Sequence, residues 1–246
     1  MNDMDMASYL SAASAMPEFV GMTVLDTIGL VIPGVDPSLR AQMEAAGIAC
    51  PYSALGLISS RTGAAGQLCA VDEAVKNSNS NTHLVSFDLP RDTKGWGGHG
   101  NYIVIGGHDV SDVREAVSVS LELTRRNAGE VYINSAGHLE FAYSARAGEV
   151  LNRAFGVPMG AAFGFMAGSP AAIGMLMADR AVKSADLTVT RYMTPSIGTS
   201  HTNEIILAFT GDTSATLTGV LTAREVGLAL LEAMGGKASG PSTPYL

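Results

Sequence analysis

Short apolar runs alternate with stretches of helical periodicity along most of the chain. Runs rich in β-branched and apolar residues predict sheet strands at 84–89, 102–106, 187–192 and 205–210. Between the first strands of this series, residues 64–77 place Leu68, Val71 and Val75 at helical spacing. The pattern therefore predicts an α-helix over 64–77 that packs against a small sheet.

Two more helices follow from the same reasoning. Pro170 stands where the matching helix of the second half would begin, and proline suits the first turn of a helix. Downstream of the 102–106 strand, Ser111 is positioned to cap a helix that carries Val113, Val117 and Leu121 on one face. Each half of the chain is thus predicted to be a sheet with helices against it.

The two halves carry the same landmarks in the same order. The repeated stretches include Ala54-Leu-Gly-Leu-Ile and Ala162-Phe-Gly-Phe-Met, then Asp72-Glu-Ala-Val-Lys and Asp179-Arg-Ala-Val-Lys, separated by 108 and 107 positions. The same alignment pairs Gly29 with Gly137 and Asn101 with Asn203. Self-similarity of this kind indicates a duplicated module.

The repeat divides the chain into four parts. We predict a leader at 1–19, a first domain at 20–128, a second domain at 129–235 and a disordered tail at 236–246, where Ser, Pro and Gly dominate the last residues. The fold class is α/β of the α+β kind, with a small, mostly antiparallel sheet flanked by helices in each domain. For the leader we favour a mobile segment. The alternative is a short amphipathic helix, because Tyr9, Leu10 and Met16 fall at helical spacing before Pro17.

Composition narrows the class of protein. Charged residues make up only 15% of the chain while apolar residues make up 47%, which indicates that much of the surface is covered in an oligomer. The net charge is −8 and no Lys/Arg cluster is present, so we expect neither nucleic acid nor a membrane surface as a partner. No apolar run is long enough for a membrane span, and the first basic residue is Arg40, so we expect a cytoplasmic protein.

The candidate chemical motifs are weak. Residues 95–100 match G-x-G-x-x-G, but a strand rather than a helix follows, so a dinucleotide site is not expected. The histidines show no metal-ligand spacing, although a threefold axis could gather copies of His99 or His201. Cys50 and Cys69 fit buried structural thiols. We expect no catalytic residue, no metal and no cofactor.

The repeated order of strand, D-x-A-V-K helix, strand, glycine-bearing loop and strand resembles the bacterial microcompartment shell domain, in its tandem-domain trimer class. The resemblance covers about 19–234. It rests on Asp26-Thr-Ile-Gly-Leu-Val-Ile with Val35-Asp-Pro, Ser60-Arg-Thr-Gly-Ala, Leu89-Pro-Arg-Asp-Thr-Lys-Gly, Gly98-His-Gly, Asp109-Val-Ser-Asp-Val, Ala136-Gly-His-Leu and Gly198-Thr-Ser.

This resemblance implies circularly permuted domains and a homotrimer that mimics a hexagon and packs edge to edge with other shell proteins. The location implied is a microcompartment within the cytoplasm, with encapsulated enzymes as possible partners. Lys76 and Lys183 would lie at the tile edges. Some relatives hold an iron–sulfur cluster through a cysteine at the pore; neither loop here has one, so that cofactor is not expected.

The resemblance also implies two loops around a central pore for small polar metabolites. The first loop contributes Arg91, Asp92, Lys94, Gly95, Trp96, Gly97, Gly98, His99 and Gly100. The second contributes Pro195, Ser196, Ile197, Gly198, Thr199, Ser200 and His201. Two alternatives stay open: a trimeric small-molecule-binding or regulatory protein, and an enzyme that uses Asp92, His99 or His201 at a subunit junction.

Overall fold

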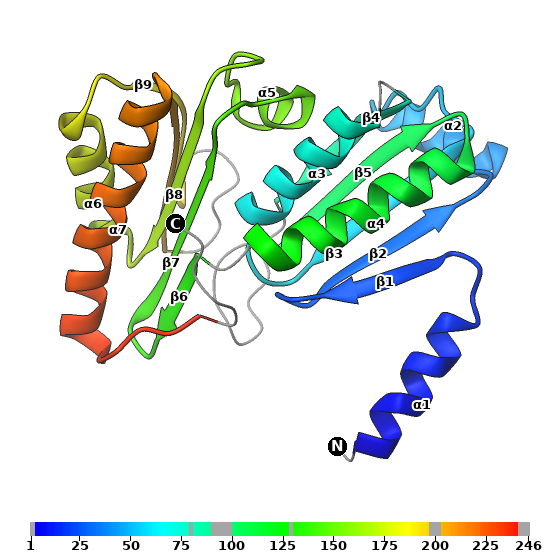
Figure 1. Cartoon of the computed structure of the whole chain (residues 1–246), viewed down its shortest axis with the longest axis horizontal. Helices are drawn as coiled ribbons and strands as arrows, with labels where there is room; N and C mark the ends of the chain where they lie inside the picture. The colour runs from blue at the N-terminus through cyan, green and yellow to red at the C-terminus, as the bar shows by residue number, and fades with distance from the viewer. Residues whose placement is uncertain (1–2, 79–80, 90–99, 128–129, 197–202, 241–246) are drawn as a thin grey trace.

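The computed structural model describes residues 3–78, 81–89, 100–127, 130–196 and 203–240, with the backbone alone for 3–7. Two five-stranded antiparallel sheets, each with helices packed against it, lie side by side (Figure 1). We call 19–127 module 1 and 131–235 module 2. The expected fold, two tandem α+β modules with antiparallel sheets, is confirmed.

Module 1 has the strand order β1-β2-β3-β5-β4. Its elements are β1 (Phe19–Thr23), β2 (Thr27–Ile32), α2 (Pro37–Ala45), β3 (Ala54–Ser60), α3 (Ala65–Asn77), β4 (Thr82–Asp88), β5 (Asn101–Gly107) and α4 (Val110–Asn127). The helix predicted over 64–77 is α3, and the strands predicted at 84–89 and 102–106 are β4 and β5.

Module 2 repeats this topology with the order β6-β7-β8-β10-β9. Its elements are β6 (Val131–Asn134), β7 (Gly137–Ser144), α5 (Glu149–Phe155), β8 (Phe163–Ser169), α6 (Ala171–Ser184), β9 (Thr188–Met193), β10 (Ile205–Thr210) and α7 (Thr213–Gly235). The predicted strand at 205–210 has the bounds of β10, and α6 begins directly after Pro170 as expected.

Sheet register corrects the repeat alignment on both sides of the D-x-A-V-K helices. Ile58 on β3 lies opposite Gly29, whereas its repeat partner Met166 on β8 lies opposite Phe141. The structural counterpart of Gly29 is therefore Phe141 rather than Gly137. On β2 and β7 the offset is 112 positions. Asn101 corresponds by the same reasoning to Ile205, because they pair with Ser60 and Gly168.

The helix after β5 begins two residues earlier than predicted. Asp109, not Ser111, holds its start: the Asp109 carboxylate accepts a hydrogen bond from the Ser111 N–H at 2.7 Å, and Ser111 lies in the first turn of α4. In module 2 the Asp212 carboxylate accepts from the Ala215 N–H at 2.7 Å. Both long helices thus start from an aspartate that satisfies otherwise unpaired N–H groups.

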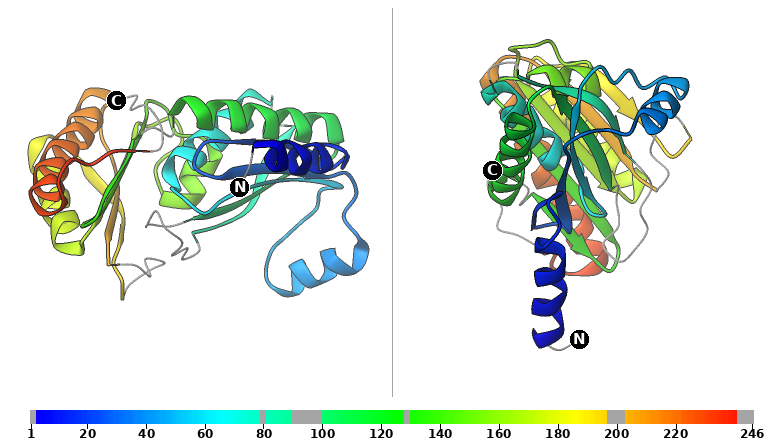
Figure 2. Two further views of the ribbon diagram at one scale, coloured as in Figure 1. Left: turned by 90° about the horizontal axis from the view of Figure 1, so that it is seen from below. Right: turned by 90° about the vertical axis from the view of Figure 1, so that its right-hand side faces the viewer.

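The sheet of module 2 is covered on both faces. Alternate residues of β8 point to opposite sides, so Met166 faces α6 and α7 while Phe165 faces module 1. The helices α3 and α5 lie between the two sheets (Figure 2). Residues of both helices and both sheets form one apolar core, which includes Leu68 and Phe155. The two modules are therefore joined by a continuous hydrophobic core.

Both ends of the chain contain regular structure, and the leader forms a helix, as in the alternative expectation. The leader contains a helix, α1 (Asp3–Ser14), which extends away from the body and leaves Tyr9 and Leu10 exposed (Figure 1). Within the tail predicted to be disordered, Ser239 forms two backbone hydrogen bonds with Ile133 on β6, and Ala238 is buried. Residues 236–240 are thus held by the sheet edge, and 241–246 lie outside the described residues.

Candidate functional site

The two predicted pore loops occupy equivalent positions, one in each module. The first joins β4 to β5 and the second joins β9 to β10. Of the predicted pore residues, the structure describes Gly100, Pro195 and Ser196. The others lie outside the described residues, at 91–99 and 197–201, and they include Asp92, Trp96, His99 and His201. A Cβ at Gly100 would lie 2.5 Å from the Ser60 carbonyl oxygen, so the close approach of the two strands there requires glycine.

The two repeated lysines occupy different environments. Lys76 Nζ donates to the Arg146 carbonyl oxygen at 2.7 Å and forms ion pairs with Asp72 and Glu73, and its side chain is 23% exposed. Lys183 is 69% exposed and pairs with Asp179 on its own helix. Lys76 therefore lies at the junction between the modules, while Lys183 faces solvent in the single chain.

Asp72 joins α3 of module 1 to the start of α5 in module 2. One carboxylate oxygen accepts from the Gly148 N–H at 2.8 Å, and the other accepts from the Val150 and Leu151 N–H groups at 3.0 and 3.2 Å. The first N–H groups of a helix have no partner within the helix. A carboxylate from one module thus satisfies the helix start of the other, at a position where Asp72 is 1% exposed.

Glu140 makes the reciprocal contact from module 2. Its Oε1 atom accepts hydrogen bonds from the Ala64 and Ala65 N–H groups, both at 2.9 Å, at the start of α3. Burial raises the pKa of the Glu140 carboxyl above its usual range, although the two hydrogen bonds act in the opposite direction. The junction is therefore fastened by two buried carboxylates, one from each module.

A buried polar cluster extends from Glu140 along the inner side of module 2. His138 on β7 contacts Glu204, before β10, at 2.8 Å, and both are buried. On the opposite face of this sheet, which packs against α7, the Tyr132 hydroxyl donates to Glu130 at 2.8 Å, and burial followed by that hydrogen bond raises the Tyr132 pKa to about 12. Sequence reasoning missed these residues because they are dispersed along the chain and match no motif.

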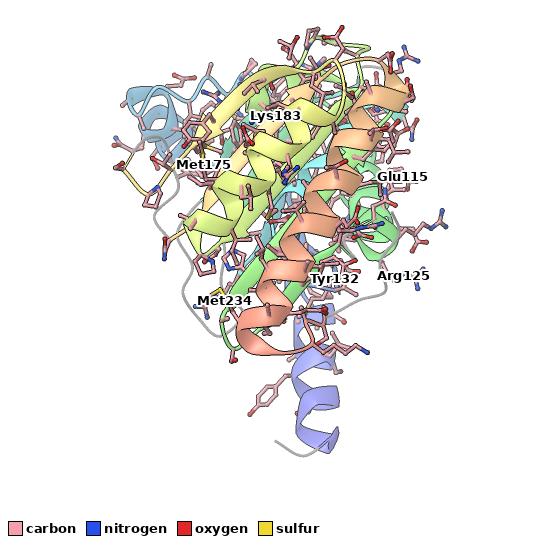
Figure 3. The ribbon with its side chains drawn as sticks, turned by 90° about the vertical axis from the view of Figure 1, so that its left-hand side faces the viewer. Glu115, Arg125, Tyr132, Met175, Lys183 and Met234 are labelled. Carbon is pink, nitrogen blue, oxygen red and sulfur yellow. The ribbon has the colours of Figure 1, made fainter. Side chains whose placement is uncertain are left out.

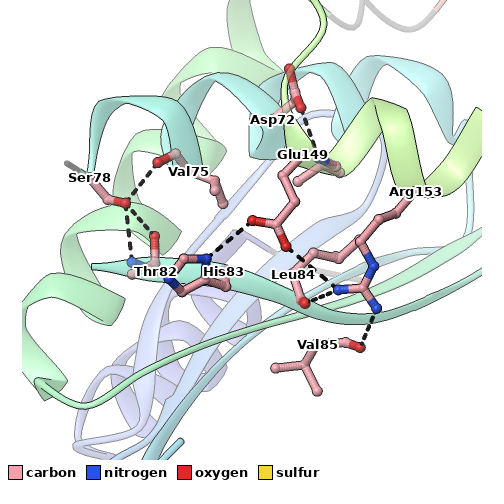
Figure 4. A network of polar contacts seen from close by, with 10 residues as sticks. Asp72, Val75, Ser78, Thr82, His83, Leu84, Val85, Glu149 and Arg153 are labelled. Carbon is pink, nitrogen blue, oxygen red and sulfur yellow. Dashed lines mark hydrogen bonds and ion pairs between the residues drawn. The ribbon is translucent and has the colours of Figure 1, made fainter. Parts of the chain in front are cut away.

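The outer end of the junction is a polar seam. His83 Nδ1 lies 3.2 Å from the Glu149 carboxylate, and Arg153 donates to the carbonyl oxygens of Leu84 and Val85 (Figure 4). A cleft of about 490 Å³ opens beside this seam. Its lining includes Glu73, Lys76, His83, Arg146, Glu149 and Met159.

The buried carboxylates of the junction hold helix starts. Asp72 and Glu140 accept hydrogen bonds from backbone N–H groups, and Cys50 and Cys69 are both buried free thiols, as predicted. Burial raises the pKa of the Cys69 thiol, which disfavours the reactive thiolate. In the part of the chain that the structure describes, no three His, Cys, Asp or Glu side chains gather as metal ligands.

One outer face of module 2 exposes large apolar side chains. Met175 and Leu176 on α6 are 53% and 40% exposed, and Val189 and Tyr192 on β9 are 45% and 42% exposed. Figure 3 shows Met175 and Lys183 on α6, away from module 1. Of the described helices, none has both the length and the apolar character of a membrane span.

The repeat and the fold agree with a known family. The BMC domain matches the chain twice, over 54–136 and 162–236. The chain belongs to the BMC-domain family of bacterial microcompartment shell proteins. Each match begins at the third strand of a sheet, β3 or β8, so the first two strands of each sheet precede the matched segment.

Known proteins and solved structures match the chain over nearly its whole length. The chain is 45% identical to the microcompartment shell protein PduB of Citrobacter freundii over 94% of this chain and 84% of that protein. It is 43% identical to PduB of Limosilactobacillus reuteri, over 94% and 95%. The crystal structure of a trimeric PduB matches with a TM-score of 0.88 at 42% identity, and that of EtuB from Clostridium kluyveri with 0.88 at 44%; both cover 94% of this chain and 100% of the other.

Proposed function

We propose that three copies of this BMC-domain protein close a flat pseudohexagonal ring, which tiles a microcompartment wall and surrounds a narrow path for small polar molecules. In this ring, α6 of one copy covers the outer face of module 1 in the next copy. The contact repeats between chains what α3 does within the chain. Six similar modules joined head to tail can close such a ring.

The observation that carries this proposal is a difference in exposure between equivalent residues. Leu68 on α3 is fully buried against module 2, whereas its counterpart Met175 on α6 is 53% exposed. The counterpart of buried Cys69 is Leu176, which is 40% exposed. A face that is covered in one module and bare in the other lacks its partner in the single chain.

The receiving side shows the same difference. Leu151 on α5 is fully buried, but its counterpart Leu39 on α2 is 49% exposed. On the docking side, beside α3 and α6, Leu84 on β4 is 3% exposed, and by sheet register it corresponds to Val189 on β9, which is 45% exposed. Exposed apolar side chains on both sides of the expected contact support burial between copies.

Oligomer formation is tested by native mass spectrometry and sedimentation at micromolar concentration. We expect a trimer with an obligate, mostly apolar interface above about 2,000 Å² in total. Leu176→Asp should shift the protein toward monomer, because it places a charge in that interface. Met234→Asp is the matched control, since Met234 is 61% exposed at the end of α7 with no counterpart buried at the junction. A monomeric wild type would contradict the ring.

Tiling and transport form the second part of the proposal. We assign Lys76 and Lys183 to the lateral contacts between tiles. The neighbouring tiles would include other shell proteins, and the shell would enclose enzymes in the lumen of an organelle in the cytoplasm. The loops at 90–100 and 194–201 are proposed to meet at the threefold axis. Electron microscopy of the purified protein tests the tile: hexagonal sheets or tubes are expected, and discrete particles that bind a small ligand would favour a binding protein instead.

A further inference from the structure

The helices α3 and α6 both begin beside a proposed pore loop. Asn101, where the first loop ends, donates to the Gly63 carbonyl oxygen at 3.1 Å, just before α3. Asn203, near the end of the second loop, accepts from the Ala171 N–H at 3.3 Å at the start of α6. Each helix is about 20 Å long. The last turns, which carry the two repeated lysines, are therefore the parts of α3 and α6 farthest from the loops, in keeping with the lateral contacts proposed for both lysines.

These last turns carry opposite charges at one equivalent position. The repeated stretches Asp72-Glu-Ala-Val-Lys and Asp179-Arg-Ala-Val-Lys differ only at their second residue, which is Glu73 on α3 and Arg180 on α6. On α3 the single lysine forms ion pairs with both carboxylates. On α6 the single carboxylate pairs with the lysine, and Arg180 is exposed. The α3 stretch thus has a surplus carboxylate, and the α6 stretch has a surplus cation.

Glu73 stays accessible although α3 is docked on module 2. Its side chain is 45% exposed, whereas that of Asp72, one residue before it, is 1% exposed. Arg180 occupies the equivalent position on α6, so it would stay accessible when another copy covers the apolar side chains of that helix. Glu73 also lines the cleft at the outer end of the junction, where Arg146 and Glu149 add one charge of each sign. Both surplus charges are thus available to a neighbouring tile.

Symmetry decides which edges can meet in a sheet whose tiles all show the same face. A ring of three two-module chains has edges of two kinds in alternation: edge 1 at the end of α3 and edge 2 at the end of α6. Opposite edges of such a hexagon differ in kind, so tiles of one orientation meet through unlike edges. Like edges meet only when one tile makes half a turn in the plane. Because three tiles meet at every corner and only two orientations exist, like contacts alone cannot build a sheet.

We infer that tiles of this protein join through unlike edges, with Glu73 of one trimer against Arg180 of the next, and that all trimers of a sheet share one orientation. The inference rests on the proposed ring and tile, and it makes a second copy of the chain the partner of each edge. Like contacts would bring together two carboxylates or two guanidinium groups, and this repulsion disfavours them. The unlike contact replaces both with an ion pair that is repeated at every boundary.

Exchange of the two charges tests this pairing. Glu73→Arg or Arg180→Glu alone places like charges at every boundary and should raise the protein concentration needed for sheet assembly at least about threefold in low salt. The double variant restores the ion pair with reversed polarity and should assemble within about twofold of wild type. Glu225→Arg, at an exposed position in the middle of α7, controls for the change in net charge and should assemble like wild type. A double variant that assembles no better than either single variant would overturn the pairing.

Electron microscopy of wild-type sheets gives an independent test. Two-dimensional class averages should show every trimer in the same orientation, with threefold but no twofold symmetry in the lattice. Neighbouring trimers related by half a turn, or showing opposite faces, would overturn the inference and leave the proposed tile intact. Wild-type trimers that form no sheet at all would overturn both the inference and the proposed tile.

Discussion

The carboxylate of Asp72 lies 2.8 Å from the backbone nitrogen of Gly148, although the two residues belong to different modules. Asp72 also accepts from Val150 and Leu151, so Asp72→Ala would leave three buried N–H groups without their acceptor. We expect the free energy of unfolding to fall by about 2–4 kcal/mol. Chemical denaturation followed by circular dichroism measures this loss.

The repeat supplies the control for that experiment. Asp179 is the counterpart of Asp72, but in the single chain its side chain is 42% exposed and forms an ion pair with Lys183 on the same helix. Asp179→Ala should therefore lower the free energy of unfolding by less than about 1 kcal/mol. Equal losses for the two variants would contradict a special role of Asp72 at the junction.

Glu140 should make stability depend on pH in a predictable direction. Because burial raises its pKa in the folded protein, ionising Glu140 costs more in the folded than in the unfolded state. Its contribution is therefore most favourable below the unfolded value of about 4.3 and declines as the pH rises through the folded pKa. In Glu140→Gln the amide oxygen can still accept from Ala64 and Ala65.

Thermal unfolding between pH 4 and pH 8 tests this dependence. The melting temperature of wild type, measured relative to Glu140→Gln, should fall as the pH rises. A difference that stays constant over the whole range would show that Glu140 does not titrate as its burial requires.

Lys183→Glu is the cleaner test of the proposed tile edge. Lys183 is exposed and can be reversed in charge without disturbing the module junction. Lys76→Glu would in addition place a carboxylate beside Asp72 and Glu73 and lose the hydrogen bond to Arg146. We expect Lys183→Glu to form trimers but few or no sheets in electron micrographs, since a small penalty is repeated at every lateral contact. Sheets like those of wild type would refute the edge assignment, and loss of the trimer would place Lys183 at the ring junction instead.

Trp96→Ala tests the proposed path through the ring. The indole is the largest side chain in the glycine-rich loop 90–100, so its removal should widen the path. In an assembled shell we expect a small alcohol or aldehyde to reach an enclosed enzyme at least about twofold faster. The rate of product formation by intact shells measures this, with the same enzyme free in solution as the reference. An unchanged rate would leave this loop a purely structural role.

Local patterns in the sequence were sufficient for most elements but not for the contacts between modules. The helix α3 was predicted within one residue because its apolar spacing and the repeated D-x-A-V-K stretch are local signals. Glu140 could not be assigned, because the N–H groups that it satisfies lie about 75 positions upstream. Ser239 was placed in a disordered tail for a similar reason: its backbone pairs with Ile133, and backbone pairing over such a separation leaves no trace in composition.

The choice between Asp109 and Ser111 as a helix cap shows a different limit. Both residue types favour that position, and in Asp109-Val-Ser111 the carboxylate accepts from the Ser111 N–H and so excludes the serine from the role. The described residues include the strands that flank each proposed pore loop, so the fold gives the attachment points of the loops, while the pore roles of their residues remain predictions.

The short connection between α4 and β6, from Asn127 to Val131, has a consequence for how assembly responds to dilution. Because it tethers module 2 to module 1, closing the α3–α5 contact is a unimolecular event with a fixed effective concentration. The contacts that α6 makes with another copy have no such tether, so the fraction of them that forms depends on the protein concentration. Lowering the protein concentration should thus open only the contacts between chains, and the smallest particle reached in this way is an intact pair of modules.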